Sequence, residues 1–280
     1  MGLTIMTNEL ALAAQRNLNN TSFRLDSVIQ HLASGSRIVR AGDDPAGLAI
    51  SDNMNAVVRS MGQAIRNAQD GISLIQVFEG GTTEINNMMI RIRELSTQAA
   101  SDTVGDRERQ MIDNEVQQLK AEITRMARTT VFAGRELLSG SNVHFEFQVG
   151  PNNDPEKDRV IFDPGGNTNM TAEGLGIDGV TVLQKEGAQN GLNSLDSALN
   201  TLNALRARIG AAQNRLQTTI NSQSTYMENM SAARARIKDA DMAVETTNLA
   251  RETILRQTGV AVLTQANETP KLALQLLRGG

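Results

Sequence analysis

Apolar side chains recur along much of this chain in alternating steps of three and four residues. The repeat is most regular between Met54 and Ala99 and again between Ala198 and Val244. A spacing of 3.5 residues is the pattern that makes α-helices wrap around one another. At about 1.5 Å per residue the first of these helices would be roughly 65–70 Å long, more than twice the diameter of a small domain. The sequence therefore predicts a mainly α fold, an elongated coiled-coil or helical-bundle rod.

A shorter helix is predicted between the two long ones, after a break at Ser101–Gly105, with Asp106 as a suitable N-cap. Its apolar seam comprises Ile112, Val116, Leu119, Ile123 and Met126. Both ends of the chain are amphipathic, over residues 4–34 and 245–277, and Gly35 is a good C-cap residue for the first of them. Helices of this length are marginal in water when isolated. We therefore expect the terminal helices to pair with each other or with those of neighbouring copies.

The period changes to two between the second and third predicted helices. Apolar and polar residues alternate from Val143 to Val149, Gly150–Pro155 is rich in turn formers, and Val160–Phe162 follows. Alternation on both sides of such a turn predicts a β-hairpin at about residues 141–165. The Gly-rich segment at about 166–190 is too short to fold alone, and we expect one short strand in it, at Val180–Leu183.

Composition and motifs narrow the classes of function. The net charge of −4 over 280 residues argues against a nucleic-acid partner, and the apolar runs are too short to cross a membrane. Without cysteine there is no disulfide, no Cys-ligated zinc and no thiol nucleophile. His31 and His144 are far apart in sequence, no H-E-x-x-H or G-x-S-x-G motif is present, and the acidic turn Asp43–Gly47 lacks the spacing of a calcium loop. We therefore expect neither catalysis nor a metal or cofactor.

Ten blocks of residues carry a family resemblance. They are Ala14–Asn19, Leu32–Ile38, Asp43–Ile50, Arg66–Leu74, Glu84–Asn87, Arg91–Leu95, Phe147–Gly150, Gly210–Leu216, Ser231–Asp241 and Val262–Asn267. In this order they resemble bacterial flagellin, and the resemblance covers residues 1–165 and 190–278. His31 replaces a residue that is usually basic in the family, Ala133 replaces an Asn, and Gly279–Gly280 extend past the usual end. The large variable outer domain of many flagellins is missing, so residues 166–190 resemble a vestige of it.

The resemblance implies a structural subunit that polymerises into the extracellular bacterial flagellar filament used for swimming. It implies a terminal coiled-coil domain, residues 1–40 with 241–280, in the inner core of the filament, and a helical-bundle domain over residues 41–240. It also implies type III export without a cleaved signal peptide, which agrees with the lack of a signal-like pattern at the N-terminus. The implied partners are other copies of the chain, a secretion chaperone, the cap protein and the hook–filament junction protein.

Two sets of contact residues are expected from the resemblance. The polymerisation core would be formed by aliphatic residues of the terminal helices, namely Leu10, Leu18, Leu25, Val28, Leu32, Leu249, Leu255, Val262, Leu263, Leu272 and Leu276. The second set begins with Arg91 and Leu95, which share a helix face and fall outside the apolar seam, so that both are predicted to point outward. In flagellins that the vertebrate flagellin-sensing Toll-like receptor detects, the matching Arg and Leu contact the receptor with a Glu that corresponds to Glu115. These three residues are therefore candidates for a receptor contact or a subunit contact.

Two other readings explain part of the pattern. The hook–filament junction protein of the same family shares the terminal helices and the bundle, but the continuous matches in the middle of both long helices favour flagellin. A secreted coiled-coil adhesin or toxin adaptor would explain the long helices but not the ordered blocks.

Overall fold

The computed structural model describes residues 8–140, 144–165 and 168–278, with the side chains given up to Thr269. The chain divides into two compact units. One unit combines residues 1–56 with residues 229–280, and the other comprises residues 57–228. The long helices α2 (Pro45–Ala99) and α4 (Lys185–Lys238) each contribute to both units. The domain boundaries expected from the sequence, near residues 40 and 241, fall in the short loops after α1 and before α5.

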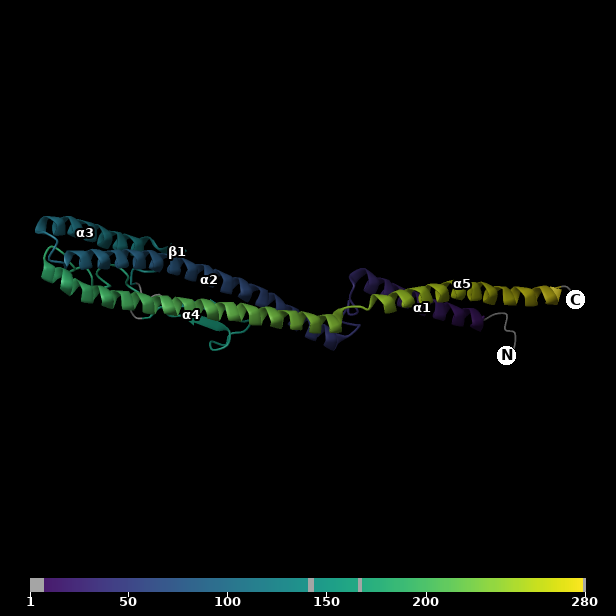
Figure 1. Cartoon of the computed structure of the whole chain (residues 1–280). Helices are drawn as coiled ribbons and strands as arrows, with labels where there is room; N and C mark the ends of the chain where they lie inside the picture. Colours follow the sequence, from purple (N-terminus) through teal and green to yellow (C-terminus); the bar gives the residue numbers. More distant parts are fainter. Residues whose placement is uncertain (1–7, 141–143, 166–167, 279–280) are drawn as a thin grey trace. The chain divides into compact units, whose positions relative to one another are not determined.

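The unit formed by the chain ends consists mainly of two paired helices, α1 (Glu9–Ser34) and α5 (Met242–Arg278), which lie side by side (Figure 1). The Asn8 side chain accepts a hydrogen bond from the backbone N–H of Ala11 and caps α1. Gly35, with φ of 68°, ends α1 in the left-handed conformation that favours glycine, as the sequence predicts. Gly259 allows close approach, because a Cβ atom there would lie 3.2 Å from Leu18 Cδ1. The terminal helices therefore pair within one chain.

The second unit is a helical bundle with a continuous apolar core, built from α2, α3 (Asp106–Thr129) and α4. The predicted seam of α2 is buried at every position from Met61 to Ala99, including Gly71, Thr82 and Ser96. A Cβ atom on Gly71 would come within 3.2 Å of both Phe147 and Leu216, so this position must stay small. Thr82 and Ser96 donate hydrogen bonds to carbonyls of their own helix, which satisfies their buried hydroxyls.

The predicted seam of α4 is buried only in its first part, from Ala198 to Leu216. Thr219 and Gln223 are half-buried, and Tyr226 is 49% exposed, so its predicted place in the core is wrong. The reason lies in the third layer of the bundle. The hairpin reaches α4 near Asn214–Thr219 and α2 near Asn67, so the part of α4 after Thr219 loses the layer that helps to enclose the earlier part of its seam.

The predicted β-hairpin is present as β3 (Phe145–Gln148) and β4 (Arg159–Phe162), with Phe145 opposite Phe162. Phe78 of α2 packs edge to face against both phenylalanines, with ring centroids 6.2 and 5.5 Å apart. Val143, the first residue of the predicted alternation, lies outside the described residues. A smaller hairpin, β1 (Val131–Phe132) with β2 (Arg135–Glu136), was not predicted. Its tight turn places both central residues, Ala133 and Gly134, at positive φ.

The segment before α4 belongs to the bundle core, although the sequence suggested a vestige with one short strand. No strand is found at Val180–Leu183, and α4 already begins at Lys185. Val182 is fully buried, as are Met170 and Ile177. The strand prediction is wrong because backbone N–H and C=O groups of this segment form hydrogen bonds with side chains rather than with a neighbouring strand.

Two charged side chains of α3 hold this segment in place. Lys120 Nζ donates hydrogen bonds to the carbonyl oxygens of Asp178 and Val180, the second at 3.1 Å. Asp113 accepts hydrogen bonds from the Thr181 hydroxyl at 3.0 Å and from the Val182 backbone N–H at 2.8 Å. Burial lowers the pKa of the Lys120 ammonium group, and the nearby Asp178 and Asp113 carboxylates oppose that shift. We call Asp113 and Lys120 the α3 clamp.

Candidate assembly surface

The paired helices α1 and α5 bury few of their side chains. In the part of this pair that the structure describes with side chains, only Thr21, Leu25, Glu252 and Ala266 are buried. A contact between two helices encloses one stripe of each, so their other apolar side chains face outward. The large apolar residues exposed on the pair are Leu10, Leu12, Phe23, Ile29, Met242, Val244, Ile254, Leu255, Val260 and Val262. Exposed apolar side chains in this number indicate an interaction site, and we call these ten residues the assembly surface.

The expected polymerisation-core residues are distributed between the helix contact and this surface. Leu25 is buried between the helices, whereas Leu10, Leu255 and Val262 are exposed. The half-buried members are Leu18, Val28, Leu32, Leu249 and Leu263. The side chains of Leu272 and Leu276 lie outside the described part. The expected polymerisation core omitted the other exposed apolar residues of the pair, namely Leu12, Phe23, Ile29, Met242, Val244, Ile254 and Val260.

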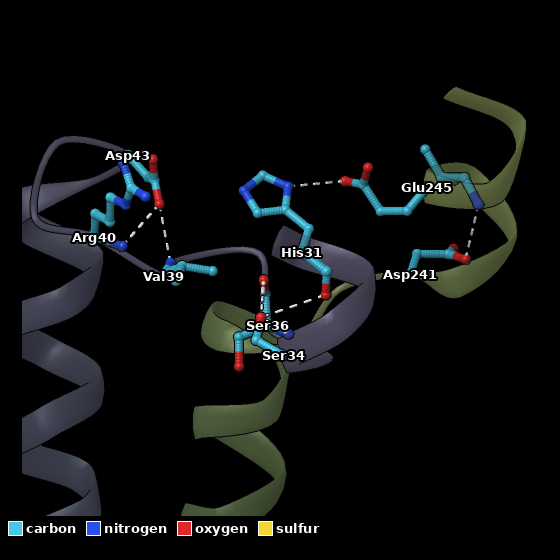
Figure 2. A network of polar contacts seen from close by, with 9 residues as sticks. His31, Ser34, Ser36, Val39, Arg40, Asp43, Asp241 and Glu245 are labelled. Carbon is cyan, nitrogen blue, oxygen red and sulfur yellow. Dashed lines mark hydrogen bonds and ion pairs between the residues drawn. The ribbon is translucent and has the colours of Figure 1, made fainter. Parts of the chain in front are cut away.

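Three polar contacts fix the register of the pair, and their residue numbers show that the helices run antiparallel. Asn8 Nδ2 donates to the carbonyl oxygen of Ala266 at 2.8 Å at one end. Arg24 pairs with the buried Glu252 at 3.3 Å. His31 Nδ1 lies 3.4 Å from Glu245 Oε1 at the other end, as Figure 2 shows.

Backbone contacts tie together the loops that follow α1 and precede α5. Arg37 N–H donates to the carbonyl oxygen of Lys238 at 2.7 Å, and Ala240 N–H donates to that of Gly35 at 3.0 Å. The Asp43 carboxylate accepts hydrogen bonds from the backbone N–H groups of Arg40 and Val39 (Figure 2). These bonds lower the pKa of the Asp43 carboxyl group, and the nearby His31 adds to the effect.

The acidic residues of these loops act as helix caps and turn formers. Asp44 accepts from the Gly47 N–H at the start of α2. Asp241 accepts from the Ala243 N–H at the start of α5. Both contacts satisfy backbone donors that a helix N-terminus leaves unpaired. Within the described residues, no group of three or more His, Asp or Glu side chains is placed to hold a metal ion.

A groove of about 360 Å³ opens between α1 and α5. Its apolar lining is formed by Ala14, Leu18, Leu255 and Val262. Its polar lining and ends include Asn17, Asn20, Thr21, Arg24 and Thr258, and Gly259 contributes no side chain that would fill it. We call this feature the α1–α5 groove.

The second candidate contact lies on the bundle unit. Arg91 Nε donates to Glu115 Oε1 at 3.0 Å, and Arg91 Nη1 lies 3.3 Å from Glu94. The hydrogen bond to Glu115, followed by that to Glu94, raises the pKa of the Arg91 guanidinium group. All three charged side chains are exposed, so Arg91 and Glu115 are adjacent on an accessible surface.

Leu95 does not belong to that surface. It is only 3% exposed and packs in the bundle core, so the prediction that it points outward is wrong. The prediction assumed that α2 buries a single heptad seam. At this level α2 is covered by more than one partner, since Arg91 reaches Glu115 of α3 and Arg93 lies 2.7 Å from Asp196 of α4. Its buried stripe is therefore wide enough to include both Leu95 and Ser96.

The two histidines are not brought together. His31 lies in the unit of the chain ends, and the exposed His144 lies in the bundle, 3.6 Å from Asp163.

Within the described residues, no helix combines the length and apolar character that a membrane span requires.

Family models match both halves of this architecture. Residues 5–143 match the bacterial flagellin N-terminal helical region, and residues 192–277 match the bacterial flagellin C-terminal helical region. A flagellin from Halalkalibacterium halodurans is 38% identical over 279 residues, which is 99% of this chain and 100% of that protein. The chain belongs to the flagellin family.

Further similarities agree with this membership. A flagellar filament 33 kDa core protein from Treponema phagedenis is 38% identical over 292 residues, covering 99% of this chain and 100% of that protein. A solved flagellar hook-associated protein from Vibrio parahaemolyticus, described as putative, superposes with a TM-score of 0.57 at 15% identity, over 70% of this chain and 100% of that one. The latter similarity concerns the fold alone. The identity to flagellins over whole chains therefore favours flagellin over the junction protein.

Proposed function

We propose that this chain polymerises through the assembly surface of α1 and α5. The chain is a structural subunit of the bacterial flagellar filament, as its family membership and its filament-protein relatives indicate. The observation that supports the assembly surface is the number of large apolar side chains exposed on a helix pair with almost no interior. Ordering these helices costs about 1–2 kcal/mol per residue in backbone entropy. Burial against neighbouring copies, at roughly 25 cal/mol per Å², offsets that cost.

A substitution on the assembly surface tests this proposal. Ile254→Asp places a charge where the proposal requires a dry contact, so seeded elongation into filaments should be lost. The rate of elongation would be measured by light scattering of purified chain mixed with filament seeds, and the filaments would be examined by electron microscopy. Ile161→Asp is the matched control, because Ile161 is a similarly exposed isoleucine on the β3–β4 hairpin. Normal filaments from Ile254→Asp would contradict the proposal.

The same reading assigns no catalytic role to the chain and places it outside the cell, in a filament that drives swimming. Export through the flagellar type III apparatus without a cleaved signal peptide belongs to this proposal. The proposal also includes three partners, namely a secretion chaperone, the cap protein and the hook–filament junction protein. Residues 1–40 with 241–280 form the inner core of the filament in this scheme, and residues 41–240 form the shell around it.

Recognition by the vertebrate flagellin-sensing Toll-like receptor is a second proposal, supported by the exposed Arg91–Glu115 pair. Arg91→Ala in a monomeric preparation should weaken receptor signalling about tenfold, equivalent to losing about 1.4 kcal/mol of binding free energy. Arg93→Ala is the matched control, because Arg93 is equally exposed but pairs with Asp196. Equal signalling by both variants would count against Arg91 as a receptor contact. Leu95 is unsuitable for this test because its substitution would disturb the core.

A further inference from the structure

Phe23 is the most exposed of the large apolar residues in the described part of the chain, at 73%. The other aromatic residues of the chain, five phenylalanines and Tyr226, all lie in the bundle unit. Aromatic side chains contribute strongly to interfaces, because a large apolar area is buried with little loss of side-chain entropy. We therefore expect the Phe23 side chain to be buried in a binding site that its own helix pair does not provide.

We propose that Phe23 of one copy inserts into the α1–α5 groove of a neighbouring copy. The inference rests on the proposed assembly through α1 and α5, and it names the residue and the site that meet. A cavity of roughly 150 Å³ with an aliphatic lining already accommodates benzene. The α1–α5 groove offers about 360 Å³ over Leu18, Leu255 and Val262, enough for a phenyl ring.

Phe23 cannot fill the groove of its own chain. Successive residues of an α-helix are about 100° apart, so Ala14, Leu18 and Thr21 of the groove lie roughly 140–180° around α1 from Phe23, and Asn20 is the nearest lining residue of α1, at about 60°. Phe23 is not part of the groove lining and is 73% exposed, so its ring points away from the groove of its own chain and is free to reach that of another copy.

Charge complementarity supports this pairing and its direction. Asp26 follows Phe23 by about 4.5 Å along the same side of α1, is exposed, and has no ion-pair partner within the described residues. Arg24 lies at the end of the groove nearest Glu252, and the adjacent Arg251 is exposed and likewise has no ion-pair partner in that part of the chain. With neighbouring α1 helices running in the same direction, a seated Phe23 brings Asp26 towards Arg251 of the other copy.

Engineered cysteines test the contact, because the natural chain has none. Chains carrying Phe23→Cys and chains carrying Thr258→Cys would be polymerised together with an excess of unmodified chain and then oxidised. We expect disulfide-linked dimers joined between positions 23 and 258, identified by mass spectrometry of the linked peptides. The matched control replaces Thr258→Cys by Gln257→Cys, an exposed neighbour outside the groove.

The outcomes separate this inference from the proposed function. Filaments in which position 23 links to position 257 as readily as to position 258 would overturn the Phe23 contact while leaving assembly intact. Failure of the unmodified chain to form filaments would instead overturn the proposed function. In addition, Phe23→Ala should raise the chain concentration needed for seeded elongation about tenfold, since the substitution empties the groove contact. An unchanged concentration would also contradict the inference.

Discussion

At the scale of single residues, the bundle distinguishes sharply between neighbours that look alike in the sequence. Ile90 and Leu95 are both aliphatic residues of α2 outside the main apolar seam. Ile90 is 44% exposed, whereas Leu95 is buried in the core. The difference depends on which side of α2 its partners cover, and that is a property of the assembled bundle rather than of the local sequence.

This difference gives a direct prediction. Leu95→Ala should reduce the free energy of unfolding by about 2–5 kcal/mol, because it leaves a cavity in a packed core. Ile90→Ala should reduce the free energy of unfolding much less than Leu95→Ala does, since much of the Ile90 side chain already contacts water. Urea denaturation followed by circular dichroism would measure both values. Equal losses for the two variants would show that Leu95 is not packed as described.

At the scale of elements, periodicity predicted the helices and the larger hairpin but not the way that loops join the core. The α2 seam from Met61 to Ala99 and the Phe145–Phe162 register follow from regular spacing, which local sequence can reveal. The α3 clamp is different, because Asp113 and Lys120 bind backbone groups some 60 residues away. Charged residues on a helix normally indicate a solvated face, so nothing in the local sequence indicates that these two are buried. The burial of Leu95 escaped prediction for a related reason, since two partner helices widen the buried stripe.

Ion pairs between elements predict how the bundle responds to acid. The Arg93 guanidinium lowers the pKa of the Asp196 carboxyl group and joins α2 to α4, while Lys185 lowers that of Asp102. A carboxylate with a pKa lowered by folding contributes stability that is complete above its unfolded pKa, about 4, and is lost as the pH falls through its folded pKa. We therefore expect Asp196→Asn to lower the thermal midpoint at pH 7 and to have a diminishing effect towards pH 3. Calorimetry of both proteins across this range would measure the difference, and a pH-independent gap would contradict the assignment.

At the scale of the whole molecule, the two units obtain their stability in different ways. The bundle encloses a continuous core of its own, from Ala68 of α2 to Leu216 of α4. The helix pair of the chain ends has capped termini and a fixed register but almost no interior. The pair therefore depends on contacts beyond the single chain far more than the bundle does. Under the proposed assembly, we expect such a division to delay the ordering of the ends until a template of other copies is available.

The α3 clamp also has a practical consequence. Asp113 fixes the chain at Val182, and α4 begins at Lys185, which is itself paired with Asp102. The connection between these anchors, Leu183–Gln184, is exposed and bears none of the core packing. A foreign peptide inserted there would be flanked by rigid structure on both sides and repeated once in every subunit. The anchors on either side of this exposed connection would thus make the chain a scaffold for presenting antigens or enzymes in a dense, regularly spaced array.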